Sequence, residues 1–72
     1  MAVYSLWDLE SANLVYSFSS EEAALQEVRL SVEALGRDAV LSWGLTRYDA
    51  DNRPHAIASG EELIKRACKI VA

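Results

Sequence analysis

The sequence predicts a single α+β domain, residues 1–72, in which a four-stranded, mainly antiparallel sheet and two helices form two layers. Three observations predict this fold. Two stretches with apolar residues at three- and four-residue steps are typical of amphipathic helices. Two short segments rich in aromatic and aliphatic residues precede each of them, as expected for strands. Polar turn residues separate the members of each pair, so the order of elements is ββαββα.

The first two strands are expected at 2–9 and 14–18, where aromatic and aliphatic residues are concentrated. The connection, residues 8–13, is polar and suits a tight turn. Asn13 tolerates the left-handed backbone conformation that such a turn requires. We therefore expect an antiparallel hairpin.

The first helix is expected at 20–35. Ser19 and Glu22 have the spacing of a capping box, in which the two side chains satisfy free N–H groups of the first turn. Gly36 follows the last apolar residue, where a left-handed residue commonly ends a helix. The apolar stripe expected to face the sheet is formed by Ala24, Leu25, Val28, Val32 and Leu35.

The second pair of strands is expected at 39–48 and 55–58, joined by the turn-rich segment 49–54. Pro54 suits a strand start or a sheet edge, because it has no N–H to donate. The second helix begins at another capping box, from Ser59 to Glu62. Its apolar stripe is formed by Leu63, Ile64, Ala67, Ile70 and Val71.

The strand order 2-1-3-4 is favoured, because the first helix reverses the chain and lets the third strand run antiparallel to the first. A third strand parallel to the second, joined by a right-handed crossover, is the alternative. Each helix has one apolar stripe, so we expect both helices on one face of the sheet. The strand residues expected to face them are Tyr4, Leu6, Leu14, Tyr16, Phe18, Leu41, Trp43, Leu45 and Ile57.

The opposite face of the predicted sheet carries no charged residue. Its members are Val3, Ser5, Trp7, Leu9, Val15, Ser17, Val40, Ser42, Gly44 and Thr46. A large uncharged face is typical of a contact surface. The candidate interface residues are Val3, Trp7, Leu9, Val15 and Val40. If the first and third strands pair, Trp7 lies over Gly44, either as an interface residue or as a cover for that glycine within the monomer.

The small size of the chain limits the ways in which it can be stabilised. A domain of 72 residues buries only roughly 60% of the surface that its unfolded chain exposes. Cys68 has no partner for an intrachain disulfide, and together with His55 it supplies too few ligands for structural zinc. Self-association remains, so we expect a homodimer or a protein partner. The sequence shows no signal peptide and no apolar run of ~20 residues, which predicts a soluble, cytoplasmic protein without membrane contact.

No residue pattern predicts catalysis, a metal site or a cofactor. Cys68 falls in the last turn of the second helix, where the helix dipole disfavours a thiolate, and we expect it to be buried or half-buried. Nothing in the sequence places His55 beside it as a base. The acidic pairs at both helix starts offset the helix dipole, and Asp49 and Asp51 fit ordinary turn chemistry. We therefore expect no enzyme activity.

The net charge of −4 disfavours non-specific binding to nucleic acid. The charges are unevenly placed: residues 1–36 hold six acidic residues and one basic residue, whereas residues 37–72 hold five acidic and six basic residues. The alternative function is therefore a nucleic-acid-associated domain, antitoxin-like or double-stranded-RNA-binding-like, in which Tyr48 or His55 could add stacking. Its candidate basic patch is formed by Arg47, Arg53, Lys65, Arg66 and Lys69.

Short motifs are spread over nearly the whole chain: residues 4–8 with 10–14, Phe18 with the helix start that follows it, residues 43–47 and residues 60–63. Together they resemble small uncharacterised bacterial proteins of about this length with a ββαββα layout. The resemblance implies a bacterial origin and an α+β fold, and it brings no activity, cofactor or partner. The sequence therefore favours a non-enzymatic interaction or regulatory module that is homodimeric through its uncharged sheet face.

Overall fold

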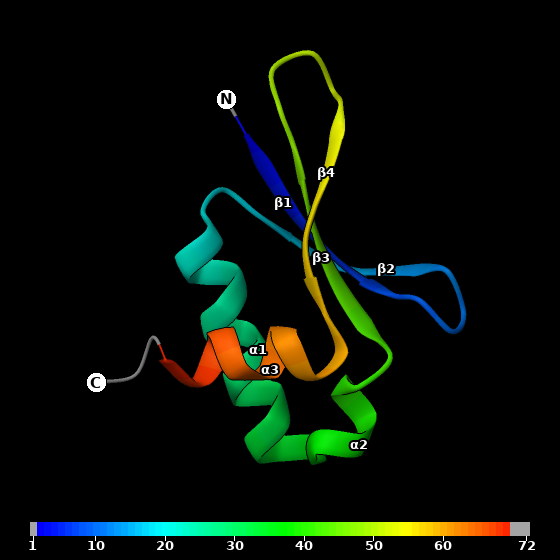
Figure 1. The fold of residues 1–72 in the computed structure, drawn as a ribbon, viewed down its shortest axis with the longest axis vertical. Helices are drawn as coiled ribbons and strands as arrows, with labels where there is room; N and C mark the ends of the chain where they lie inside the picture. The colour runs from blue at the N-terminus through cyan, green and yellow to red at the C-terminus, as the bar shows by residue number, and fades with distance from the viewer. Residues whose placement is uncertain (1, 70–72) are drawn as a thin grey trace.

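The structure is a computed structural model that describes residues 2–69. Its strands and long helices follow the predicted ββαββα order, with one additional short helix before the third strand (Figure 1). The elements are β1 (Val3–Asp8), β2 (Asn13–Phe18), α1 (Glu21–Leu35), α2 (Arg37–Val40), β3 (Trp43–Tyr48), β4 (Pro54–Ser59) and α3 (Gly60–Lys69).

The four strands form one antiparallel sheet in the order β2-β1-β3-β4, which confirms the favoured topology. In the central pair, Leu6 lies opposite Leu45, and Trp7 lies opposite Gly44. Because successive side chains point to opposite faces, Leu6 and Leu45 share one face of the sheet and Trp7 and Gly44 share the other. This register decides which residues are available for function.

The helices α1 and α3 both lie on the face of Leu6 and Leu45 and pack against each other, as predicted (Figure 1). The buried residues between them are Leu6, Ala24, Leu25, Val28, Val40, Leu45, Leu63, Ile64 and Ala67. Partly buried residues pack around this core and include Tyr4, Phe18, Val32, Trp43 and Ile57. Leu35, at the end of the predicted stripe, is exposed, and Ile70 and Val71 lie outside the described residues.

The ends of α1 differ in how well the sequence predicts them. The N-cap is Ser20, whose side-chain oxygen accepts a hydrogen bond from the N–H of Ala23 at 3.1 Å. The predicted capping box from Ser19 is therefore one residue too early. At the other end Gly36 has a φ of +92°, which favours glycine, and its N–H donates to the carbonyl of Val32 at 2.9 Å. The predicted helix end is confirmed.

The predicted strand 39–48 is wrong over its first four residues. Residues 37–40 form the helical turn α2, closed by a 3.0 Å hydrogen bond from the N–H of Leu41 to the carbonyl of Arg37. This turn directs Val40 into the core, where it is fully buried, whereas Leu41 is 41% exposed. Burial of Val40 by a helical turn therefore replaces the predicted strand pairing in this segment.

Each outer strand contains a β-bulge. Val15 is the extra residue in β2, because Leu6 faces Tyr16 while the next residue, Trp7, faces Leu14. The bulge transfers Leu14 to the face of Trp7, so its predicted place against the helices is wrong. Tyr16 keeps the predicted face but is 61% exposed, and its ring stacks on Phe18 at a centroid distance of 5.2 Å.

The second bulge lies in β4, where Ile57 is the extra residue between the partners of Leu45 and Thr46. It lets Ile57 and its neighbour Ala58 both pack against the core. Within residues 2–69, no helix is both long and apolar enough to cross a membrane.

Candidate functional site

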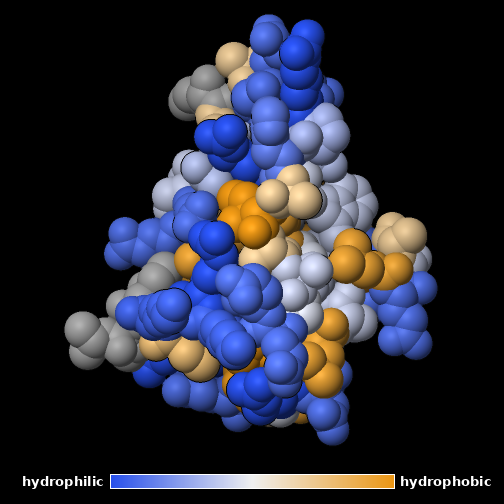
Figure 2. Space-filling model, in the orientation of Figure 1, coloured by the Kyte–Doolittle hydropathy of each residue, from blue (hydrophilic) through white to orange (hydrophobic). Residues whose placement is uncertain are grey.

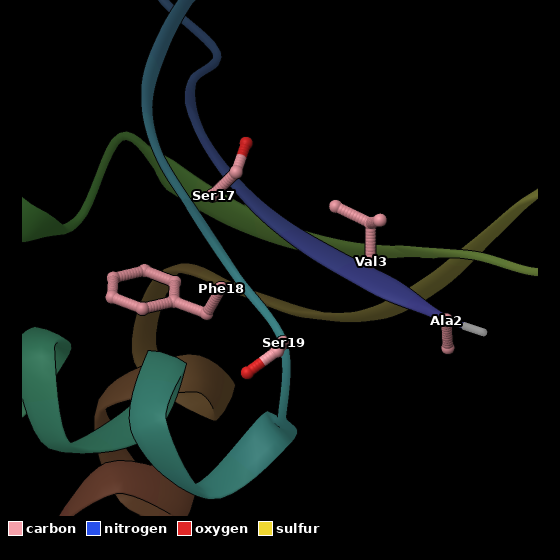
Figure 3. Close-up of a pocket in the computed structure, with 5 residues that line it drawn as sticks. All are labelled: Ala2, Val3, Ser17, Phe18 and Ser19. Carbon is pink, nitrogen blue, oxygen red and sulfur yellow. The ribbon is translucent and has the colours of Figure 1, made fainter.

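The face of the sheet that points away from the helices, called the reverse face below, is the main candidate site. Register and alternation place on it the residues Val3, Ser5, Trp7, Leu9, Leu14, Ser17, Gly44, Thr46, Tyr48, Pro54, Ala56 and Ser59. Figure 3 shows the arrangement at one corner of the sheet: Val3 and Ser17 point away from the helices, whereas Phe18 lies on the helix side. The side chains of this face come from all four strands and from the turn after β1.

The reverse face exposes apolar side chains. Leu9 is 58% exposed, Leu14 is 50% exposed and Val3 is 44% exposed, while Trp7 is partly buried among its neighbours. In Figure 2 hydrophobic atoms are visible on the side of the molecule where Figure 1 places the β1–β2 turn. Leu9 and Leu14 lie toward the β1–β2 turn and Val3 lies at the other end of β1. Exposed apolar residues on an uncharged sheet face are typical of contact surfaces.

The charged residues of the strands all lie on the other face. Asp8 is the partner of Trp43, which packs against the core, and Arg47 is the partner of Tyr4. His55 is in turn the partner of Arg47. Among the described residues of the reverse face there is no acidic or basic side chain. The uncharged character predicted from the sequence therefore holds in the structure.

Of the five predicted interface residues, three lie on the reverse face: Val3 and Leu9 are exposed there, and Trp7 is partly buried. Val15 is exposed as the extra residue of the β2 bulge, where it has no partner in β1. Val40 is a wrong prediction, because α2 places it in the core with no exposed surface. Leu14 is the residue that the sequence prediction missed, since no local signal in the sequence marks the bulge that turns it to this face.

A hollow of about 240 Å³ lies beside Gly44 and is lined in part by Leu9, Thr46 and Ala56. A Cβ atom built on Gly44 would lie 2.9 Å from Cδ1 of Leu9, so the Leu9 side chain occupies the space over the glycine. The predicted pairing of Trp7 with Gly44 is confirmed. The nearest atoms that a side chain at Gly44 would meet nevertheless belong to Leu9, which makes Leu9 the cover of this glycine.

A second cavity, of about 310 Å³, lies at the opposite corner of the sheet, where β1 begins and β2 ends (Figure 3). It is lined by Ala2, Val3, Ser17, Phe18 and Ser19. Next to it the hydroxyl oxygens of Ser5 and Ser17 are 3.5 Å apart across the two strands. The lining contains no charged side chain, so this cavity suits an apolar group.

The residues of the predicted basic patch are distributed over different parts of the fold. Lys65, Arg66 and Lys69 are exposed on α3. The Nη1 atom of Arg66 lies 3.9 Å from Oε2 of Glu21. Arg53 belongs to the β3–β4 turn, at the far end of the molecule from α3 (Figure 1). Arg47 lies in β3 between Tyr4 and His55. The structure thus groups the three α3 residues and separates Arg53 from them.

His55 is engaged with the turn that precedes it. Its Nε2 lies 3.0 Å from Oδ2 of Asp49, whose Oδ1 accepts backbone hydrogen bonds from Asp51 and Arg53, both at 2.9 Å. The hydrogen bond with His55, followed by those from the backbone, lowers the pKa of Asp49 below its usual value. The arrangement stabilises the hairpin turn.

Cys68 is exposed on α3, which corrects the expectation that it is buried or half-buried. Residues 2–69 contain no cluster of three or more His, Cys, Asp or Glu side chains that could hold a metal ion.

The ββαββα layout agrees with the resemblance noted from the sequence motifs, without identifying a family. Comparison of the chain with known protein families, with curated proteins and with solved structures finds no match.

Proposed function

We propose that this protein is a non-enzymatic interaction or regulatory module that forms a homodimer through its reverse face. The observation that carries the proposal is the separation of side chains on the sheet. Exposed Leu9, Leu14 and Val3 lie on a face without charge, while the charged strand residues lie on the helix side. A face of this composition is stabilised when a second apolar surface removes it from water.

The net charge favours this face over the rest of the surface for contact between two copies. Each copy carries a net charge of −4, so two copies repel each other on average. The reverse face has no charged side chain among the described residues, so a contact through it adds no repulsion between like charges. Sheets packed face to face in this manner are a common architecture, with side chains of the two inner faces interdigitating.

Dimerisation also suits the size of the core. Only nine apolar residues are buried among those described, and the chain has no disulfide. Small domains commonly gain stability from a partner subunit. A single cysteine, exposed on α3, further suits the reducing environment of the cytoplasm, where we place this module.

The test compares two leucines of nearly equal exposure. Leu14 is 50% exposed on the reverse face, and Leu30 is 47% exposed on α1. We expect the wild-type chain and the Leu30→Lys variant to be dimers by size-exclusion chromatography with light scattering. The Leu14→Lys variant should be a monomer, because it places a hydrated charge in the contact. A wild-type chain that is monomeric at millimolar concentration, or two variants that behave alike, would overturn the proposal.

The alternative nucleic-acid role has less support. Only three residues of the basic patch share one surface, and one of them, Arg66, lies within ion-pair distance of Glu21. Exposed cations that are paired with acids in a protein of net charge −4 are typical of an ordinary solvated surface. We therefore favour a protein partner.

A further inference from the structure

The free edge of β2 has the properties of a peptide-binding edge. In the strand order β2-β1-β3-β4, β2 and β4 are the outer strands. Proteins usually protect such edges with charged residues, proline or coverage by another element. β4 begins with Pro54 and runs directly into α3. β2, from Asn13 to Phe18, contains neither proline nor a charged residue.

The edge is also accessible. The first five residues of β2 are exposed and Phe18 is partly buried, and no other described strand pairs with its outer side. The bulge at Val15 is the one protective device in this strand, and it leaves Tyr16 to Phe18 in regular pairing with β1. Backbone N–H and C=O groups on an open edge are best satisfied by another extended chain.

A side-chain site lies at the end of this edge. The cavity of about 310 Å³ is lined by Ser17, Phe18 and Ser19 of the β2 end and by Ala2 and Val3 of the β1 start (Figure 3). A strand added along β2 would bring alternate side chains past this cavity. An aliphatic side chain fits its uncharged lining, so the edge offers backbone pairing and one pocket for specificity.

The charges at both ends of β2 identify the partner. Asp8 and Glu10 precede the strand, and Glu22 follows it together with Glu21, whose carboxylate lies 3.9 Å from Arg66. Two copies of β2 paired in either direction would bring these acidic ends together, which disfavours self-pairing along this edge. A chain with basic residues on both sides of an uncharged strand places opposite charges at both ends.

We propose that the β2 edge binds an extended peptide segment as a fifth strand, and that this segment has alternating aliphatic residues with basic residues on both flanks. The backbone contact uses the outer edge of β2, while the cavity at its end also includes Val3 and Ser17 of the reverse face. The peptide proposal does not rest on the homodimer, because peptide binding at β2 and the oligomeric state are measured separately.

The test uses a defined probe, the blocked peptide acetyl-KKVTVTVKK-amide, added to the isotope-labelled full chain. We expect chemical-shift changes at the backbone amides of residues 13–19 and none of similar size in β4. Fluorescence anisotropy of the labelled peptide should show binding that weakens as salt is raised, because the flanking pairs are exposed. Absence of binding at millimolar peptide in low salt, or changes centred on β4, would overturn the proposal.

Charge variants test whether the basic peptide is attracted to the acidic residues at the ends of β2 or to the acidic protein as a whole. The double variant Glu10→Gln/Glu22→Gln should weaken peptide binding about fivefold, as expected for the loss of two exposed ion pairs. The matched variant Glu33→Gln/Glu62→Gln loses the same charge on α1 and α3 and should bind as the wild type does. Equal effects of the two variants would contradict the assigned edge.

Strand addition itself is tested on the peptide, which avoids any effect on folding of the protein. Methylation of alternate backbone nitrogens along the pairing side removes the N–H donors and should weaken binding at least about tenfold. A methylated peptide that binds as well as the parent would exclude a fifth strand. Amide shifts in β2 that depend on protein concentration without peptide would show self-pairing and would also overturn the proposal.

Discussion

Single residues in the two hairpin turns adopt a left-handed backbone conformation. Asn52, in the β3–β4 turn, has a φ of +62°, and Ala12, in the β1–β2 turn, has a φ of +59°. Asparagine tolerates this conformation through local hydrogen bonding, whereas the Cβ atom of alanine makes it unfavourable. The sequence suggested Asn13 for this role, but Asn13 is the first residue of β2. The residue with the unfavourable conformation is therefore Ala12.

Replacing Ala12 by glycine should stabilise the fold by roughly 0.5–1 kcal/mol, since relief of backbone strain exceeds the added flexibility of the unfolded chain. Chemical denaturation monitored by tryptophan fluorescence measures the difference. Ala34→Gly, at an exposed position in the last turn of α1, is the control and should destabilise by up to about 1 kcal/mol. A destabilised Ala12→Gly variant would contradict the conformation assigned to this turn.

The contribution of Asp49 to the free energy of unfolding should depend on pH. The lowered pKa of its carboxyl means that the folded state favours the charged form, so the stability it provides is present above the unfolded pKa of about 3.8. That stability is lost as the pH falls through the lower pKa of the folded state. The difference in unfolding free energy between wild type and Asp49→Asn should therefore narrow below about pH 4. Urea titrations of both proteins from neutral to acidic pH measure this difference. A difference in unfolding free energy that stays constant would contradict the hydrogen bonding assigned to Asp49.

At the scale of elements, the helices are predicted better than the strands. Apolar spacing identifies the buried positions Leu25, Val28, Leu63 and Ile64, because a helix repeats its buried side over many residues. The short helix α2 is missed, since four residues are too few to show a period. Aliphatic residues such as Val40 are compatible with either structure, and tertiary burial decides between them.

A matched pair of leucines on α1 tests the assigned orientation of this helix. Leu25 is 3% exposed and Leu30 is 47% exposed. We expect Leu25→Ala to lower the free energy of unfolding by about 3 kcal/mol, because it leaves a cavity between α1 and the sheet. Leu30→Ala should change it by less than about 0.5 kcal/mol. Equal losses at both positions in chemical denaturation would mean that α1 is rotated from the orientation described.

The bulges explain why the candidate surface is only partly predictable. Simple alternation along the strands assigns Val3, Trp7 and Leu9 to the reverse face and is confirmed there. The same rule fails for Leu14, because one extra residue in β2 reverses the faces of all positions before it. No residue type in the segment requires a bulge, so its position depends on how β2 fits its neighbours in the folded sheet.

At the scale of the whole molecule, the strand order and the placement of both helices on one face follow from the pattern of elements. A chain whose two helices each have one apolar stripe can bury both stripes in one core only when they share a face. Leu6 and Leu45, at the centre of the sheet, are buried by both helices together. The predicted strand order already makes β2 an edge strand. The cavities could not be predicted, because they depend on the ends of strands and on local packing.

Dimerisation through the reverse face should link thermal stability to protein concentration. A tenfold increase in concentration should raise the Tm of the wild-type chain by about 4 °C, because association stabilises the folded state by mass action. Differential scanning calorimetry over two decades of concentration measures the effect. The Leu14→Lys variant should show a Tm independent of concentration, and a flat wild-type response would argue for a monomer.

The separation of the sheet into an apolar face and an open edge has a consequence for valency. If two copies stack through their faces, the outer side of β2 in each copy remains outside the contact. The assembly then presents two equivalent strand-accepting edges related by a two-fold axis. A target that displays two suitable segments on a linker of matching length would gain from the high effective concentration of the second segment after the first is bound. Weak individual contacts would then add up to a tight, selective complex with repeated or dimeric targets.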